Sequence, residues 1–166
     1  MRNFFLYLAF ALLFLIIKNT LLHAVFPPLL IPDVILIMVF YLGFYRISVE
    51  GALTAFALGY LSDVFSGGII GISSFTLVLT FIITSMLSKI VSLNSMLIKS
   101  GGAIFASILN GIMTYIFLRF LNDGIPFYTI FLTAVSTGIA SPFIIALLQK
   151  AESYITPYKR EGKIID

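Results

Sequence analysis

Several residue types are missing from this sequence or rare in it. It has no cysteine and no tryptophan, a single histidine, and only 10% charged residues among its 166 positions. The lack of cysteine excludes a disulfide framework, a thiolate metal site and a cysteine nucleophile. The single His23 excludes any site that needs two imidazole groups. Ten basic and seven acidic residues are too few and too scattered for a nucleic-acid-binding surface. We therefore expect no cofactor, no metal and no nucleic-acid partner.

Apolar residues, in contrast, are abundant. They make up 60% of the chain, and the mean hydropathy is +1.12, whereas a soluble domain is about 45–50% apolar and about 25% charged. This composition argues against a soluble globular domain and against disorder, which requires low hydrophobicity. A membrane-spanning helix needs roughly 20 apolar residues, so the chain has room for about six spans. The composition predicts an all-α polytopic membrane protein.

Six apolar segments predict a bundle of six transmembrane helices in one domain over residues 1–150. The second and third segments are expected to be short or irregular, because prolines interrupt the first half of the second and the third has only about 15 residues. Pro32 fits the first turn of a helix, and the Asp33 carboxylate suits the positive end of the helix dipole. The expected bounds are Phe4–Leu22, Phe26–Tyr45, Gly51–Phe65, Ile69–Leu87, Gly101–Leu118 and Phe127–Leu148.

Basic residues at the segment ends predict the orientation of the bundle. On one side of the membrane only Lys18 and Arg119 are expected, and the positive-inside rule assigns the richer side to the cytoplasm. Both termini would then be cytoplasmic, which requires an even number of spans. Residues 151–166 are expected to form a short basic cytoplasmic tail. The residues expected on the richer side are Arg2, Arg46, Lys89, Lys99, Lys150, Lys159, Arg160 and Lys163.

Ionisable side chains inside apolar segments are costly, so each should have a partner. We expect Lys18 or Arg119 to form an ion pair with Asp33 or Asp63. Two alternatives stay open: Lys18 can reach the interface along its own stem, and Arg119 can bridge to Asp123 one turn later.

Asp63 continues a stripe of small residues along one helical face, formed by Gly51, Ala55 and Gly59. Small residues at this spacing allow two membrane helices to approach closely, so Asp63 should face protein. At the C-terminal end of a helix the dipole disfavours a carboxylate. Something nearby should therefore compensate it, either inside the bundle or on a partner.

Catalysis is not indicated by the motifs that are present. Asp33 and Asp63 are a conceivable aspartyl peptidase pair, but the surroundings typical of intramembrane aspartyl peptidases are absent. Ser73 and Ser74 follow Gly71 as in a serine elbow, yet no histidine occurs later in the chain to act as a base. We expect a non-enzymatic protein.

A proline followed by aspartate, and a second motif about 25 residues later, resemble the signature of the MreD family of rod-shape-determining membrane proteins. The second motif follows the family pattern G-x-x-x-D-x-x-S-G-x-x-x-G. The resemblance is close over residues 30–75 and weaker over residues 136–150. The residues that carry it are Pro32, Asp33, Gly59, Asp63, Ser66, Gly67 and Gly71. We expect the glycines to allow tight packing, and Asp63 to fix the following loop by ion pairing or by accepting backbone N–H bonds.

The resemblance implies a multi-pass subunit of the bacterial cell-elongation complex in the cytoplasmic (inner) membrane. Such a subunit contacts the bitopic protein MreC, and through it MreB, RodA and a penicillin-binding transpeptidase, to organise lateral peptidoglycan synthesis. Self-association is compatible with this role. In fold the family resembles the substrate-binding subunits of energy-coupling-factor transporters. The alternative function is therefore a vitamin or small-molecule uptake subunit, although the A-x-x-x-A motif of those subunits is missing, since Leu13 follows Ala9.

Overall fold

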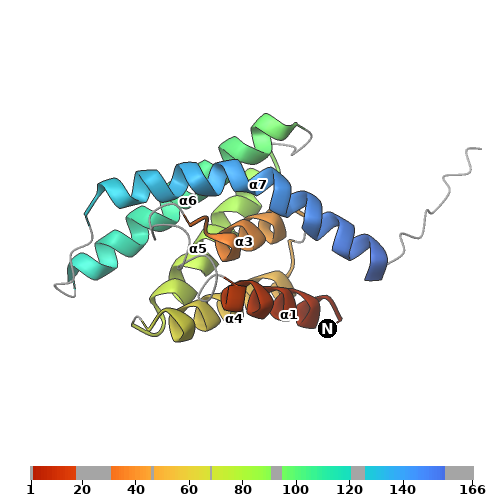
Figure 1. Cartoon of the computed structure of the whole chain (residues 1–166), viewed down its shortest axis with the longest axis horizontal. Helices are drawn as coiled ribbons and strands as arrows, with labels where there is room; N and C mark the ends of the chain where they lie inside the picture. The colour runs from red at the N-terminus through yellow and green to blue at the C-terminus, as the bar shows by residue number, and fades with distance from the viewer. Residues whose placement is uncertain are drawn as a thin grey trace, which may run out of the picture.

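The computed structural model describes residues 2–17, 31–45, 47–67, 69–90, 95–120 and 126–155. These ranges contain helices and no strands, so the expected all-helical class is confirmed for them (Figure 1). The helices are α1 (Arg2–Ile17), α3 (Val34–Tyr45), α4 (Val49–Ser66), α5 (Ile72–Leu87), α6 (Met96–Phe120) and α7 (Tyr128–Ile155).

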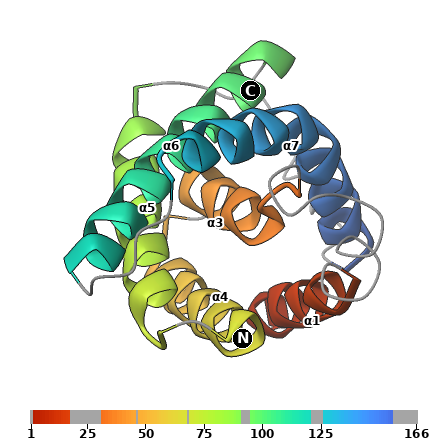
Figure 2. The same ribbon diagram turned by 60° about the vertical axis from the view of Figure 1, so that its left-hand side comes forward.

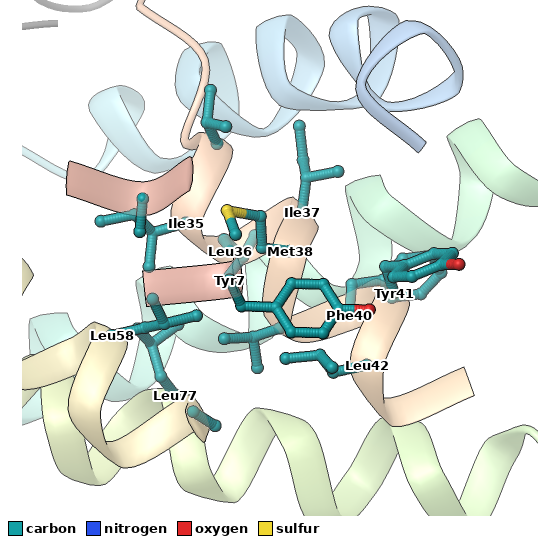
Figure 3. Packing of buried hydrophobic residues seen from close by; sticks show 14 of the residues in the cluster. Tyr7, Ile35, Leu36, Ile37, Met38, Phe40, Tyr41, Leu42, Leu58 and Leu77 are labelled. Atoms are coloured by element: carbon teal, nitrogen blue, oxygen red, sulfur yellow. The ribbon is translucent and has the colours of Figure 1, made fainter. Parts of the chain in front are cut away.

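Helix α3 is the centre of the fold. It contacts each of the five other described helices, and Figure 2 shows it enclosed by them. Its residues from Val34 to Gly43 are all buried, which fits a helix that is apolar on every side. Figure 3 shows Tyr7 of α1, Leu58 of α4 and Leu77 of α5 packing around the α3 side chains.

The helices run alternately in opposite directions, which gives the bundle two distinct ends. Helix α4 ends and helices α3, α5 and α7 begin at the left of Figure 1, which we call the Asp63 end. Helix α1 begins and α7 ends at the opposite side, the Lys150 end. The most extensive contacts join α6 to α7 and α4 to α5.

Several helix ends differ from those expected. Helix α3 begins at Val34, so Pro32 precedes the helix and does not lie in its first turn as predicted. Helix α6 begins five residues before the expected Gly101, where the Ser95 side chain accepts the N–H of Ile98 at 3.4 Å. Helix α7 continues to Ile155 and crosses the expected domain boundary at residue 150.

Proline 142 lies inside α7 without ending it. A proline has no N–H, so the carbonyl four residues earlier, on Gly138, loses its helical donor. The Ser141 hydroxyl donates to this carbonyl at 2.9 Å. A side-chain donor of this kind is how membrane helices accommodate proline.

Two of the described helices are long and apolar enough to cross a membrane, over Met96–Phe120 and Tyr128–Ala151. Three further apolar stretches are shorter, over Tyr7–Ile16, Val34–Tyr45 and Ile72–Leu87. At about 1.5 Å per residue, the 12 residues of α3 extend roughly 18 Å.

The surface of the bundle, like its core, carries large apolar side chains. Large apolar side chains such as Phe120, Phe143 and Leu97 are more than three-quarters exposed. Hydroxyl side chains, in contrast, are buried on α5, where Thr80 and Thr84 donate to carbonyls of their own helix at 2.8 Å. Soluble monomers rarely expose large apolar surfaces of this kind.

Candidate functional site: the turn between α4 and α5

The Asp63 carboxylate joins the end of α4 to the start of α5. It is 3% exposed. One oxygen accepts the backbone N–H of Gly71 at 2.7 Å, and the other accepts the N–H of Ser73 at 3.2 Å. These amides belong to the first turn of α5, which has no side-chain cap of its own. Asp63 therefore caps a helix other than the one that carries it.

This geometry explains how the carboxylate is tolerated at the C-terminal end of α4. The positive end of the α5 dipole lies against it and offsets the negative end of α4. Two amides that α5 would otherwise leave unpaired are satisfied at the same time. Of the two expected ways to fix the loop, ion pairing or backbone bonds, the structure has the backbone bonds.

Gly59 lies one turn before Asp63 at the point where α4 and α5 come closest. A Cβ atom added there would lie 2.6 Å from the backbone nitrogen of Ser74 and 2.7 Å from the carbonyl oxygen of Ser73. Backbone atoms cannot move aside as a flexible side chain can. Only glycine fits at this position, as the small-residue stripe predicted.

Gly67 and Gly71 shape the connection itself. Gly67 ends α4 in the left-handed conformation with φ of 65°, and Gly71 precedes α5 with φ of 108°. A Cβ atom at either position would meet nothing within 4 Å, so the need for glycine there is conformational. The Ser66 hydroxyl donates to the carbonyl of Ser62 at 2.8 Å, in the last turn of α4.

The second part of the sequence motif lies at the start of α3. The Asp33 carbonyl accepts the first helical N–H, from Ile37, and its side chain accepts the N–H of Leu36 at 3.2 Å. Asp33 is thus the N-terminal cap of α3, and Pro32 stands immediately before the cap. The Asp33 N–H donates to the Thr137 hydroxyl of α7 at 3.1 Å, which ties the start of the central helix to its neighbour.

A polar pocket of about 170 Å³ lies beside Asp33. Residues of α6 and α7 complete it, including Asn110, whose buried side-chain oxygen has no hydrogen-bond partner in the part of the chain that the structure describes. The sequence showed Asn110 only as one member of a small-residue stripe on α6. That α6 brings it to Asp33 depends on the tertiary fold. The lining residues are Asp33, Ser107, Asn110, Gly111, Thr114, Thr129, Ile130 and Thr133.

The expected intramembrane ion pairs are not tested by this geometry. Lys18 lies outside the described residues, as do His23 and Asp123. Arg119 is exposed near the end of α6. In the described ranges no group of three or more histidine or acidic side chains is suited to hold a metal ion.

The structure therefore brings five of the motif residues together at the junction of α4 and α5, namely Gly59, Asp63, Ser66, Gly67 and Gly71. Asp33 lies apart from them, as the N-terminal cap of α3. The chemistry of both arrangements is that of fixed backbone geometry and hydrogen bonding. Comparison with known families, with characterised proteins and with solved structures finds no match to this chain.

Proposed function

We propose that the chain is an integral membrane protein that crosses the bacterial cytoplasmic membrane six times. The exposed apolar side chains support this placement because they are stable against lipid tails. The buried hydroxyl groups support it because a hydroxyl group without a hydrogen bond is costly in hydrocarbon. The Lys150 end would face the cytoplasm, since Lys99 and Lys150 lie toward it. The Asp63 end would then face outward.

We further propose that the protein is a non-enzymatic subunit of the cell-elongation complex, similar to the MreD family. The observation that carries this proposal is the pair of hydrogen bonds that the Asp63 carboxylate accepts from the N–H groups of Gly71 and Ser73. Asp63, Gly71 and Gly59 are positions of the family signature, and the local geometry gives a reason for each of these residue types. The motif therefore describes one rigid unit of the fold.

The physical role of this unit would be to present a fixed surface to another membrane protein. The close backbone contact at Gly59 opposes sliding of the two helices, and the capped turn cannot open without losing two partly buried hydrogen bonds. A preorganised surface binds a single-span partner at lower entropic cost than a flexible one. We propose an MreC-like bitopic protein as this partner, and through it MreB, RodA and a penicillin-binding transpeptidase.

Affinity capture tests this proposal. The tagged chain is expressed with the MreC-like protein of the same organism, solubilised in mild detergent and captured. We expect the partner to be retained by the wild type and by Gly101→Ala, an exposed glycine with nothing within 4 Å of an added Cβ atom. Retention should fall at least about tenfold with Gly59→Leu. A monodisperse wild type that retains none of the partner would contradict the proposal.

The polar pocket favours a second function, that of a substrate-binding subunit for vitamin or small-molecule uptake. Such a subunit needs a polar site at the outer side of the bundle, and the pocket lined by Asp33 and Asn110 lies toward the Asp63 end. The missing A-x-x-x-A motif on the first helix argues against this alternative. Tight binding of a vitamin by the purified protein would favour it.

A further inference from the structure

Several hydrogen-bond acceptors line the pocket between α3, α6 and α7. The Thr129 hydroxyl donates its proton to the Pro126 carbonyl at 2.7 Å, and the Thr133 hydroxyl donates to the Thr129 carbonyl. Both oxygens therefore offer only lone pairs to the pocket. The Asp33 carboxylate and the Asn110 side-chain oxygen are further acceptors on the same lining.

Two of these acceptors lack adequate partners within the described residues. The Asn110 oxygen is buried with no hydrogen bond among these residues, which is unfavourable for a polar group. The Asp33 carboxylate has a single backbone donor, the N–H of Leu36. An ionised carboxylate in an apolar bundle calls for a counter-charge. Among the described residues that line this pocket, none is basic.

We propose that this pocket binds a protonated primary amino group. An ammonium group offers three N–H donors and one positive charge, which matches the Asp33 carboxylate and the Asn110 amide oxygen, both of which lack sufficient partners among the described residues. The pocket has a volume of about 170 Å³, equal to that of about six water molecules at roughly 30 Å³ each, which gives room for a small head group. The amine belongs to a phospholipid head group or to a free molecule.

This inference rests on the membrane placement proposed above, but it is independent of a role in cell elongation. Binding of an amine would add a second interaction that holds the start of α3 in place, beside the hydrogen bond from the Asp33 N–H to the Thr137 hydroxyl. Occupancy of the pocket would then stiffen the junction of α3, α6 and α7.

Lipid retention measured by native mass spectrometry tests the proposal. The full chain is purified from nanodiscs that contain equal parts of phosphatidylethanolamine, phosphatidylcholine and phosphatidylglycerol. We expect phosphatidylethanolamine to be retained at least about tenfold over the other two. Phosphatidylcholine has the same cationic charge without N–H donors, and phosphatidylglycerol has hydroxyl donors without a cation. Equal retention of the three lipids would overturn the proposal.

Two variants make the test specific. Asp33→Asn removes the charge but keeps an oxygen that can cap α3, and Asn110→Leu removes the unpaired acceptor. We expect each to reduce the preference for phosphatidylethanolamine at least about tenfold. The control is Glu50→Gln, which removes a carboxylate in the first turn of α4, away from this pocket. A preference unchanged in Asp33→Asn would overturn the proposal.

The source of the amine is distinguished by competition. Ethanolammonium chloride is added to the wild-type complex with phosphatidylethanolamine. Displacement of the lipid shows that free amines also enter the pocket, and retention shows that the lipid is the ligand; both results support recognition of the amino group. Because no elongation partner is present, failure here and failure of the proposed function are separate outcomes.

Discussion

Replacing Gly59 with alanine is expected to lower the free energy of unfolding by about 1–3 kcal/mol, and replacement with leucine by more. The added Cβ atom would lie 2.6 Å from the backbone nitrogen of Ser74. Helices α4 and α5 would have to separate, and the hydrogen bonds that Asp63 accepts from Gly71 and Ser73 would lengthen. Thermal unfolding in detergent, followed by circular dichroism at 222 nm because the chain has no tryptophan, measures this loss.

Gly101→Ala is the matched control for that experiment. Gly101 also lies inside a helix, but an added Cβ atom there meets nothing within 4 Å. Alanine is favoured over glycine in a helix interior by about 1 kcal/mol. The control should therefore be as stable as the wild type or more so. A Gly59→Ala protein as stable as Gly101→Ala would contradict the close backbone approach.

Replacing Asp63 with asparagine is expected to destabilise the protein by about 2–3 kcal/mol. The carboxylate accepts two amide N–H bonds with two different oxygens, whereas asparagine has one oxygen and would direct its NH₂ group at the other amide. A hydrogen bond to a charged group contributes about 1.5–3 kcal/mol. The midpoint of thermal unfolding should fall, and the amides of Gly71 and Ser73 should exchange their hydrogens faster.

Asp33→Asn provides the comparison for this prediction. At Asp33 the carboxylate accepts a single N–H, from Leu36, so one asparagine oxygen can replace it. The expected loss is below about 1 kcal/mol. Equal losses for Asp33→Asn and Asp63→Asn would mean that the pair of hydrogen bonds accepted by the Asp63 carboxylate is not what fixes the turn.

Much of the fold could be predicted from the apolar segments. The uninterrupted run Val34–Tyr45 is the helix α3 that the structure contains, because a continuous apolar run with no polar side suits a fully enclosed helix. The stripe ending in Asp63 is buried along its length, at Gly51, Ala55, Gly59 and Asp63. Periodicity alone identifies such a face, since residues four apart lie on one side of a helix.

Helix ends were less predictable, because polar residues near a membrane boundary can lie inside or outside a helix. Lys99 suggested a loop before Gly101, but Ser95 caps the helix four residues earlier than Lys99. Gln149 and Lys150 suggested a tail, but both are good helix formers, and α7 continues to Ile155.

The contacts between residues of different helices could be predicted only in part. Asp63 meets the amides of residues eight and ten positions later, and the sequence left ion pairing and backbone bonding as equal alternatives. The pocket joins Asp33 to residues more than 70 positions away. Periodicity states which side of a helix is apolar, but not which helix lies against it.

The central claim is that this protein serves cell elongation and not uptake, and depletion in its own host tests it most directly. The protein is depleted in ordinary and in vitamin-rich medium, and cell shape is followed by microscopy. The account predicts that rod-shaped cells become round in both media, and that shape is restored by wild-type protein and by Gly101→Ala but not by Gly59→Leu. Cells that keep their shape, with growth rescued only by vitamins, would contradict it.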